Sequence, residues 1–360
     1  MRGAASVMKQ AMQKLNSLLL LLIAAGTLPC CAQVNSGYDT PNLETYFQRY
    51  IGLNADQIQD LRSGQPISKT LISRRPAEIF VFGAVYVNAS PDAYIAFATN
   101  FDRLRDIPGY IAVGTFTSPP QLSDLNGFSF DSDDIEALKK CAPANCEIQM
   151  PGNAMQSFQS VIDWSAPNAA EQLNQLLRKT ALERLIAYQR DGNDALGVYN
   201  DKEHPTNVQD QFRYILSYTT VLPERFPDFY RYLLSYPHDK PANAKDSFYW
   251  EKVKFGLKPT LRVIHTVTMA TDTPNGRGYV IAEKQLYASH YFQTALDLTF
   301  CIPEPLDGKR GFYLIKIMGS EQAGLTGLKG SVVRKVAVGR SASTLQKSLA
   351  LIKKALEQGS

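Results

Sequence analysis

The segment that decides the fold of this chain begins with the run Pro259-Thr-Leu-Arg-Val-Ile-His-Thr-Val-Thr-Met-Ala-Thr271. Apolar residues alternate with polar ones along it, and only Ile264 interrupts the alternation. The residues that share the apolar face are Leu261, Val263, His265, Val267 and Met269. Because successive side chains of a strand point to opposite faces, this pattern predicts a half-buried antiparallel strand.

More strands and a helix follow this run. Residues 279–302 and 312–318 are rich in β-branched and aromatic residues and are bounded by turn sequences, so each predicts a strand. A last short strand is expected at 332–338. Within 341–356 the apolar residues recur at helical spacing, at Leu345, Leu349, Ile352 and Leu356. The sequence therefore predicts an α+β fold, in which an antiparallel sheet packs its apolar face against a long C-terminal helix.

Residues 1–32 have the pattern of a secretory signal peptide. A basic stretch precedes the apolar run 18–25, and small residues follow up to Ala32. Cleavage after Ala32 would place the mature chain in the periplasm or outside the cell. A lipoprotein anchor at Cys30 or Cys31 is the alternative, although a proline directly before Cys30 is unfavourable for acylation.

Charge bears on the partners of the mature chain. Cleavage removes Arg2, Lys9 and Lys14 and no acidic residue, so the formal net charge falls from +4 to +1. A nearly neutral chain lacks the excess of basic residues that binds nucleic acid, so we expect no nucleic-acid partner. Residues 33–76 are polar and carry no recognisable chemistry, and we interpret them as an N-terminal extension.

Three cysteines follow the signal segment. Cys141 and Cys146 enclose the turn formers Pro143 and Asn145, so in an oxidising compartment they predict a disulfide that closes a small loop. A metal or redox pair is the alternative, but the spacing is not Cys-x-x-Cys and no second pair or nearby histidine completes a site. We therefore expect no metal. Cys301 is expected to be a buried small hydrophobe.

A buried strand leads directly into an amphipathic helix near the start of the mature chain. The unit Val85-Tyr-Val-Asn-Ala-Ser-Pro-Asp-Ala-Tyr-Ile-Ala-Phe97 resembles the opening of the StAR-related lipid-transfer superfamily, which is also called START-like or helix-grip. The later strands and the helix at 341–356 resemble the end of the same family. The resemblance covers 78–102 and 247–358. It implies a curved antiparallel sheet that grips the C-terminal helix, with a lipid, sterol, polyketide or other apolar ligand between them.

Residues 103–245 stand where that family has a short helical link, and we interpret them as a large helical insertion. Helices are predicted at 168–192, 209–221 and 227–236. Seven tyrosines gather in this region, at positions 188, 199, 214, 218, 230, 232 and 236. They indicate either an aromatic-rich helical core or a lid over the mouth of a cavity. Segments 248–259 and 287–292 also resemble secreted bacterial proteins of unassigned function, which implies no activity.

No catalytic signature is present for metalloproteases, serine hydrolases or nucleotide-binding enzymes, and no cofactor is expected. The candidates that remain are His265 and His290, which both lie on the apolar face of their strands. If the strands turn near Asn275, His265 pairs near residue 285. At ~3.3 Å per residue, His290 is then roughly 17 Å away, too far to share one metal ion. Each histidine is either part of the core or orients a polar group of a ligand, with acid–base catalysis as a third interpretation.

The leading hypothesis is a secreted or periplasmic protein that binds or transfers an apolar, lipid-like small molecule between the sheet and the C-terminal helix. Its predicted ligand-binding residues are His265, His290, Tyr287, Phe292 and Met269. Transfer of a lipid would also involve transient contact with a membrane. One alternative is a cyclase- or hydrolase-type enzyme on the same scaffold, which uses His265 or His290 with Tyr287 or Asp297. The other is a structural cell-envelope protein with a filled core, which a cavity well below ~300 Å³ would favour.

Overall fold

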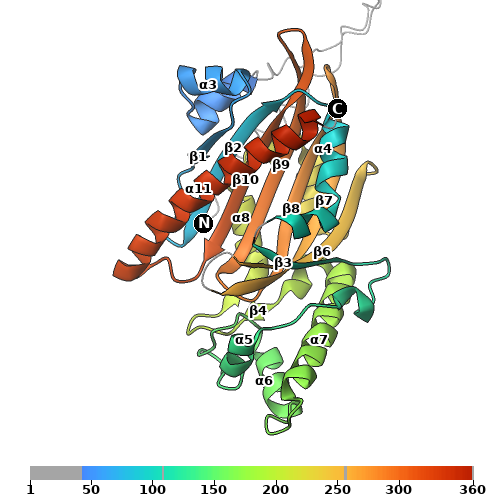
Figure 1. Ribbon diagram of the computed structural model, residues 1–360, viewed down its shortest axis with the longest axis vertical. Helices are drawn as coiled ribbons and strands as arrows, with labels where there is room; N and C mark the ends of the chain where they lie inside the picture. The colour runs from blue at the N-terminus through green and yellow to red at the C-terminus, as the bar shows by residue number, and fades with distance from the viewer. Residues whose placement is uncertain (1–42, 108, 255–257, 359–360) are drawn as a thin grey trace, which may run out of the picture. The chain divides into compact units, whose positions relative to one another are not determined.

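The computed structural model describes residues 43–107, 109–254 and 258–358. Its main feature is one eight-stranded antiparallel sheet, in the order β1-β2-β10-β9-β8-β7-β6-β3. In that order the strands are Ile67–Thr70 (β1), Glu78–Val87 (β2), Lys309–Gln322 (β10), Phe292–Leu306 (β9), Gly276–Ala288 (β8), Pro259–Thr273 (β7), Ala244–Lys254 (β6) and Tyr110–Thr115 (β3). The sheet is open, because β1 and β3 are its two edges (Figure 1).

A single long helix, Gly327–Gln358 (α11), crosses one face of this sheet (Figure 1). Leu345 and Leu349 pack against Gly83 of β2, where a Cβ atom would come within 2.8 Å of either side chain. Glycine at this position therefore allows the helix to lie directly on the strand. Leu345, Leu349 and Leu356 share a buried core with β2 and β10. The predicted α+β class, an antiparallel sheet with a long C-terminal helix, is confirmed.

Two predicted boundaries are wrong. The run 279–302 is not one strand but parts of β8 and β9, which are joined by a tight turn that ends at Tyr291. Tyr291 adopts a positive φ of 63°, and the turn contains no glycine or proline that would have indicated it. Residues 332–338, predicted as a strand, belong to α11. Strand propensity is a weak preference, and here the helical context overrides it.

Two short helices follow β2 on the same side of the sheet as α11. The first, Pro91–Ala98 (α4), begins as predicted: the Ser90 hydroxyl accepts a hydrogen bond from the backbone N–H of Ala93 at 3.2 Å. Tyr94 of α4 is buried in the core that α11 covers. The second is the 3-10 helix Phe101–Asp106 (η2), whose Phe101 stacks on Tyr249 of β6 with ring centroids 4.4 Å apart. These helices cover the part of the sheet that α11 leaves uncovered.

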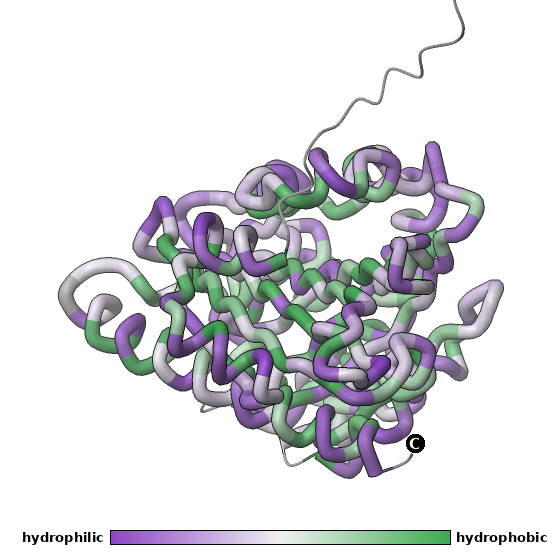
Figure 2. The backbone as a smooth tube through the Cα atoms, turned by 90° about the horizontal axis from the view of Figure 1, so that it is seen from above, coloured by the Kyte–Doolittle hydropathy of each residue, from purple (hydrophilic) through white to green (hydrophobic). Residues whose placement is uncertain are grey.

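The helices of the insertion cover the opposite face. They are Leu122–Leu125 (η3), Ser132–Leu138 (α5), Gly152–Val161 (α6), Ala169–Asp191 (α7), Gly192–Leu196 (η4), Val208–Leu216 (α8), Val221–Arg225 (α9) and Pro227–Ser235 (α10), with a small ribbon of Val198–Tyr199 (β4) and Thr206–Asn207 (β5). Ile215 of α8 approaches Gly319 of β10, and Tyr188 of α7 reaches His265. The helices predicted at 168–192 and 227–236 are confirmed as α7 and α10, and the one predicted at 209–221 corresponds to α8, which ends earlier, at Leu216. Figure 2 shows the hydrophobic segments gathered in the middle of the molecule.

The N-terminal part of the described chain adds an edge to the sheet. It consists of Leu43–Tyr46 (α2), Phe47–Ile51 (η1), Ala55–Arg62 (α3) and β1. Phe47 packs edge-on against Phe82 and Tyr313. In the described part of the chain, no helix has the length and apolar character needed to cross a membrane. The predicted signal peptide, residues 1–32, lies outside the described residues.

Candidate functional site

His265 lies on the face of the sheet that the insertion covers, not on the face that α11 covers. Thr268 of the same strand pairs with Ile281, which belongs to the core under α11, so residues of the opposite parity face away from that helix. The expectation that His265 points into the space between the sheet and the C-terminal helix is therefore wrong. The alternation of residues shows which side chains share a face of the strand. Because both faces are covered here, it does not show which helix covers which face.

Protein side chains satisfy both ring nitrogens of His265, which is only 1% exposed. Its Nε2 atom lies 2.7 Å from Oδ1 of Asp246, and its Nδ1 atom lies 3.0 Å from the hydroxyl oxygen of Tyr188. The ring of Phe248 stacks on the imidazole with centroids 4.5 Å apart. Burial lowers the pKa of His265, and the hydrogen bond to Asp246 only partly offsets this. His265 is therefore neutral at pH 7.

His290 is held in a different place, in the turn between β8 and β9. Its Nε2 atom lies 3.0 Å from Oδ1 of Asp134 in α5. His265 pairs with Lys284, one residue from the position expected, because the hairpin turns between Thr273 and Gly276, with its centre between Pro274 and Asn275 and not on Asn275. Among the described residues, no group of three or more His, Cys, Asp or Glu side chains could hold a metal ion.

The other predicted ligand-binding residues do not gather around either histidine. Tyr287 faces the insertion, where its ring meets that of Tyr199 edge-on at 6.4 Å. Met269 is buried on β7, paired with Ala244 and Val280. Phe292 lies at the start of β9, with its ring 5.4 Å from the guanidinium carbon of Arg262. The predicted set therefore occupies several separate environments.

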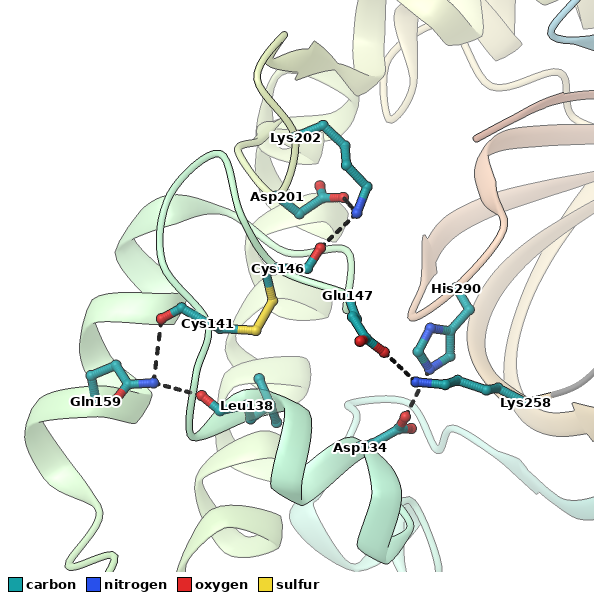
Figure 3. The surroundings of a disulfide bond; sticks show 10 residues. All are labelled: Asp134, Leu138, Cys141, Cys146, Glu147, Gln159, Asp201, Lys202, Lys258 and His290. Carbon is teal, nitrogen blue, oxygen red and sulfur yellow. Dashed lines mark hydrogen bonds and ion pairs between the residues drawn. A yellow bond between two sulfur atoms is a disulfide. The ribbon is translucent and has the colours of Figure 1, made fainter. Parts of the chain in front are cut away.

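Cys141 and Cys146 lie at bonding distance, with Cα atoms 4.5 Å apart, which is compatible with the predicted disulfide (Figure 3). The ends of the loop are held to neighbouring segments. Lys202 donates to the carbonyl of Cys146 at 2.6 Å, and Gln159 donates to the carbonyl of Cys141 at 3.4 Å. Cys301 is free and buried, as expected, and burial raises the pKa of its thiol.

The side of the sheet that bears α4 and α11 carries a row of charged residues that we call the charged cluster. Each of five consecutive strands contributes one member: Glu251 (β6), Arg262 (β7), Glu283 (β8), Asp297 (β9) and Lys316 (β10). Glu251 pairs in register with Arg262, and Glu283 pairs with Asp297. The register therefore places the members of each of these two pairs side by side, whereas Arg262 pairs with Ala288 on β8 and Lys316 pairs with Thr299 on β9.

Ion pairs and hydrogen bonds organise the charged cluster. Arg262 binds Glu251 with an N–O distance of 2.8 Å, and Lys316 lies 3.7 Å from Glu283. The hydroxyl of Tyr249 donates to Oε1 of Glu283 at 3.1 Å. The Glu251 side chain is 1% exposed, whereas that of Glu283 is 27% exposed. The Glu251 end of the cluster is thus sealed, and solvent reaches its middle at Glu283.

Asp297 is the member with an unusual acidity. Burial, with a further contribution from the neighbouring Glu283, raises the pKa of Asp297 to about 6. Lys316 and Arg262 act in the opposite direction and reduce the rise. Burial also raises the pKa of Glu251. The site therefore contains, next to Glu283, a carboxyl group that takes up or gives up a proton readily near neutral pH.

A hydrogen bond holds helix α4 against the sheet near the charged cluster. The hydroxyl of Tyr279 on β8 donates to the carboxylate of Asp92 on α4. The arrangement can bind a polar or positively charged group, and Asp297 can exchange a proton with it.

The sequence does not predict the charged cluster, because the polar residues that alternate along these strands are expected to face solvent. The signal that could have revealed it is a charged residue on that parity of each of five neighbouring strands, and Asp297 alone was named, in the enzyme alternative. A comparison with protein-family models finds no match to this chain, and a comparison with curated proteins also finds none.

Proposed function

We propose that this chain is a periplasmic or secreted protein that binds or transfers a small molecule, held against the charged cluster beneath α4. The observation that supports this most is the partly exposed carboxyl pair Glu283–Asp297 on an otherwise covered face of the sheet. A protein that needed only a filled core would gain nothing from two adjacent acids there, since burying charge without a strong partner is costly.

The ligand site in this proposal differs from the space under α11. Leu345 and Leu349 pack directly on Gly83, which leaves no space for a ligand between the helix and the strand at that point. Beneath α4 the partly exposed neighbours include both apolar groups, such as Met318 and Tyr279, and the acids of the charged cluster. The proposed ligand is therefore amphiphilic, with an apolar body and an amine or hydroxyl group that the carboxyl pair binds.

One observation favours a second candidate function, a proton-transfer enzyme on the same site. A general acid or base works best when its pKa lies near the working pH, and that of Asp297 is about 6. Glu283 would be the partner that binds the substrate. This candidate keeps Asp297 from the enzyme alternative of the sequence analysis, and Glu283 takes the place that His265 or His290 had there.

The test begins with the compound that copurifies with the protein. Organic extraction followed by mass spectrometry should recover a small molecule from the wild type and much less from Asp297→Asn. Asp272→Asn, which alters an exposed acid on β7, is the matched control and should retain the compound. Equal retention by both variants, or loss from both, would contradict the site.

The same compound separates binding from catalysis. Incubation of fresh wild-type protein with the recovered compound should leave it unchanged if the protein only binds or transfers it. Conversion at saturating compound that falls about 10²–10⁴-fold in Asp297→Asn, beyond the loss of binding, would instead establish general acid–base catalysis. The proposed compartment is tested by N-terminal sequencing of exported protein, which should begin at Gln33.

A further inference from the structure

Helix α11 differs in charge from the rest of the molecule. It contains seven basic residues and one acid, Glu357, which gives it a formal charge of +6. A chain that begins at Gln33 has a total charge of +1, so everything outside α11 carries −5. One sign of charge concentrated on a single element attracts partners of the opposite sign.

Four of the basic residues point directly away from the sheet. The buried leucines of α11 face the sheet, and at 3.6 residues per turn the opposite side of the helix carries Lys329, Arg340, Lys347 and Lys354. All four are exposed, and within the described chain no acidic side chain forms an ion pair with any of them. The last three recur every seven residues, which places them in one row at intervals of about 10.5 Å. In Figure 1, α11 lies in front of the sheet and no other described helix or strand covers its outward side.

Two other basic residues of α11 have structural partners. Arg334 donates to the carbonyl of Pro76 at 3.0 Å. Lys353 donates to the carbonyl of Tyr86 at 2.9 Å and pairs with Glu357 at 2.6 Å. These contacts hold the helix to β2 and to the loop before it, whereas the outward row holds nothing within the described chain.

Apolar side chains lie beside the first part of the outward row. The exposed valines there are Val332, Val333 and Val336, with exposed fractions of 67%, 53% and 49%. Ile72 is 94% exposed, and it lies next to Ser73, whose hydroxyl accepts a hydrogen bond from Arg334 at 2.6 Å. An exposed isoleucine is therefore held close to the same part of the helix. Bulky apolar side chains gathered on a surface indicate a partner that buries them.

We infer that the outward side of α11, with Ile72 beside it, docks on a membrane that contains anionic lipids. The basic row contacts the headgroups, and the valines and Ile72 enter the boundary between the headgroups and the acyl chains. An acidic protein or a nucleic acid offers the charge without the apolar layer. This surface lies apart from the charged cluster beneath α4, and the inference does not depend on the ligand proposed for that cluster.

Sedimentation with lipid vesicles tests the inference on exported protein that begins at Gln33. Vesicles of phosphatidylglycerol and phosphatidylcholine in equal parts should bind the protein at low salt, and vesicles of phosphatidylcholine alone should bind it far less. A basic residue near an anionic surface raises the affinity roughly fivefold. Substitution of Arg340→Gln, Lys347→Gln and Lys354→Gln together should therefore weaken binding about 10²-fold.

The matched control combines Lys140→Gln, Lys179→Gln and Arg225→Gln. It removes the same charge from exposed positions of the insertion, on the other face of the sheet, and should bind nearly as the wild type does. All six positions are exposed and glutamine is a good helix former, so both triple variants should fold.

A third variant separates a membrane from other anionic partners. Val332→Ser with Val336→Ser leaves the charge unchanged and should weaken vesicle binding about tenfold, because these side chains no longer gain from entering the lipid. Equal binding to both kinds of vesicle, or equal losses in the two triple variants, would overturn the inference. Unchanged vesicle binding by the valine variant, with equally tight binding of the wild type to polyglutamate, would assign the surface to an acidic macromolecule. Sedimentation of the wild type without vesicles would assign it to a second copy of this chain.

Discussion

Glu283 of β8 and Asp297 of β9 are register partners, so two acidic side chains project side by side from adjacent strands. The raised pKa of Asp297 has a cost, because the group must ionise in a buried place beside another acid. When the pKa of an acid is higher in the folded state than in the unfolded state, the free energy of unfolding falls as the pH rises between the two values. In the wild type this loss of stability should be complete above pH 6 and absent below about pH 3.8.

The first prediction is that Asp297→Asn stabilises the fold at high pH. At pH 8 the free energy of unfolding should rise by about 1–3 kcal/mol, since one pKa unit corresponds to ~1.4 kcal/mol. The gain should shrink as the pH falls from 6 towards 4. Urea denaturation at several pH values measures this, with Asp272→Asn as control. A gain in the free energy of unfolding that does not vary with pH would show that the surroundings do not raise the pKa of Asp297.

The second prediction concerns His265. His265→Phe keeps an aromatic ring in the stack with Phe248 but leaves Asp246 and the Tyr188 hydroxyl without their shared partner. Loss of a buried partner costs about 1–3 kcal/mol, so the free energy of unfolding should fall by that amount at pH 7. His204→Phe, in an exposed loop, should change it little. Equal effects of the two substitutions would contradict the structural role given to His265.

The third prediction concerns the contact between α11 and β2. Gly83→Ala places a methyl group against Leu345 and Leu349, and overpacking of this kind costs about 1–3 kcal/mol. Gly339→Ala is the matched control: nothing lies within 4 Å of its added Cβ, and alanine favours a helix over glycine by about 1 kcal/mol. Denaturation should therefore show opposite signs for the two. Stabilisation by Gly83→Ala would mean that the helix does not pack directly on the strand.

The fourth prediction concerns the loop closed by Cys141 and Cys146. Denatured, unreduced protein that begins at Gln33 should show one reactive thiol, that of Cys301. Three thiols would rule out the bridge. Because the loop is short, the chain-entropy model limits its contribution to about 2 kcal/mol, so Cys141→Ser with Cys146→Ser should still fold.

Much of the sheet could be predicted from residue patterns. Alternation along 259–271 identified a strand with one buried face, and the turn near Asn275 placed His265 within one residue of its true partner, Lys284. The helix cap at Ser90 was also predictable, because capping is a local interaction. These features depend on neighbours in sequence or on a single hairpin.

The remainder depends on contacts that no local pattern contains. Whether α11 or α7 covers the face of His265 is decided by long-range packing, since residues on both faces of β7 are buried, the polar Thr260 and Thr266 on one face and Val267 on the other. The charged cluster was not predicted for the same reason. The polar residues of a strand normally face solvent, but here α4 and η2 cover the face of the sheet on which they lie. The turn that ends at Tyr291 has no glycine to mark it.

The pairing of β3 with β6 has a consequence for how this chain can change over evolution. Thr115 pairs with Tyr249, so the chain leaves the sheet after β3 and returns to the adjacent place. In topological terms, everything between them is one very long hairpin loop. Doubling the length of such a loop adds only ~0.6 kcal/mol to its closure entropy. Helices can therefore be added to this loop at little cost in chain entropy, whereas the loss of one would expose the face of the sheet that it buries.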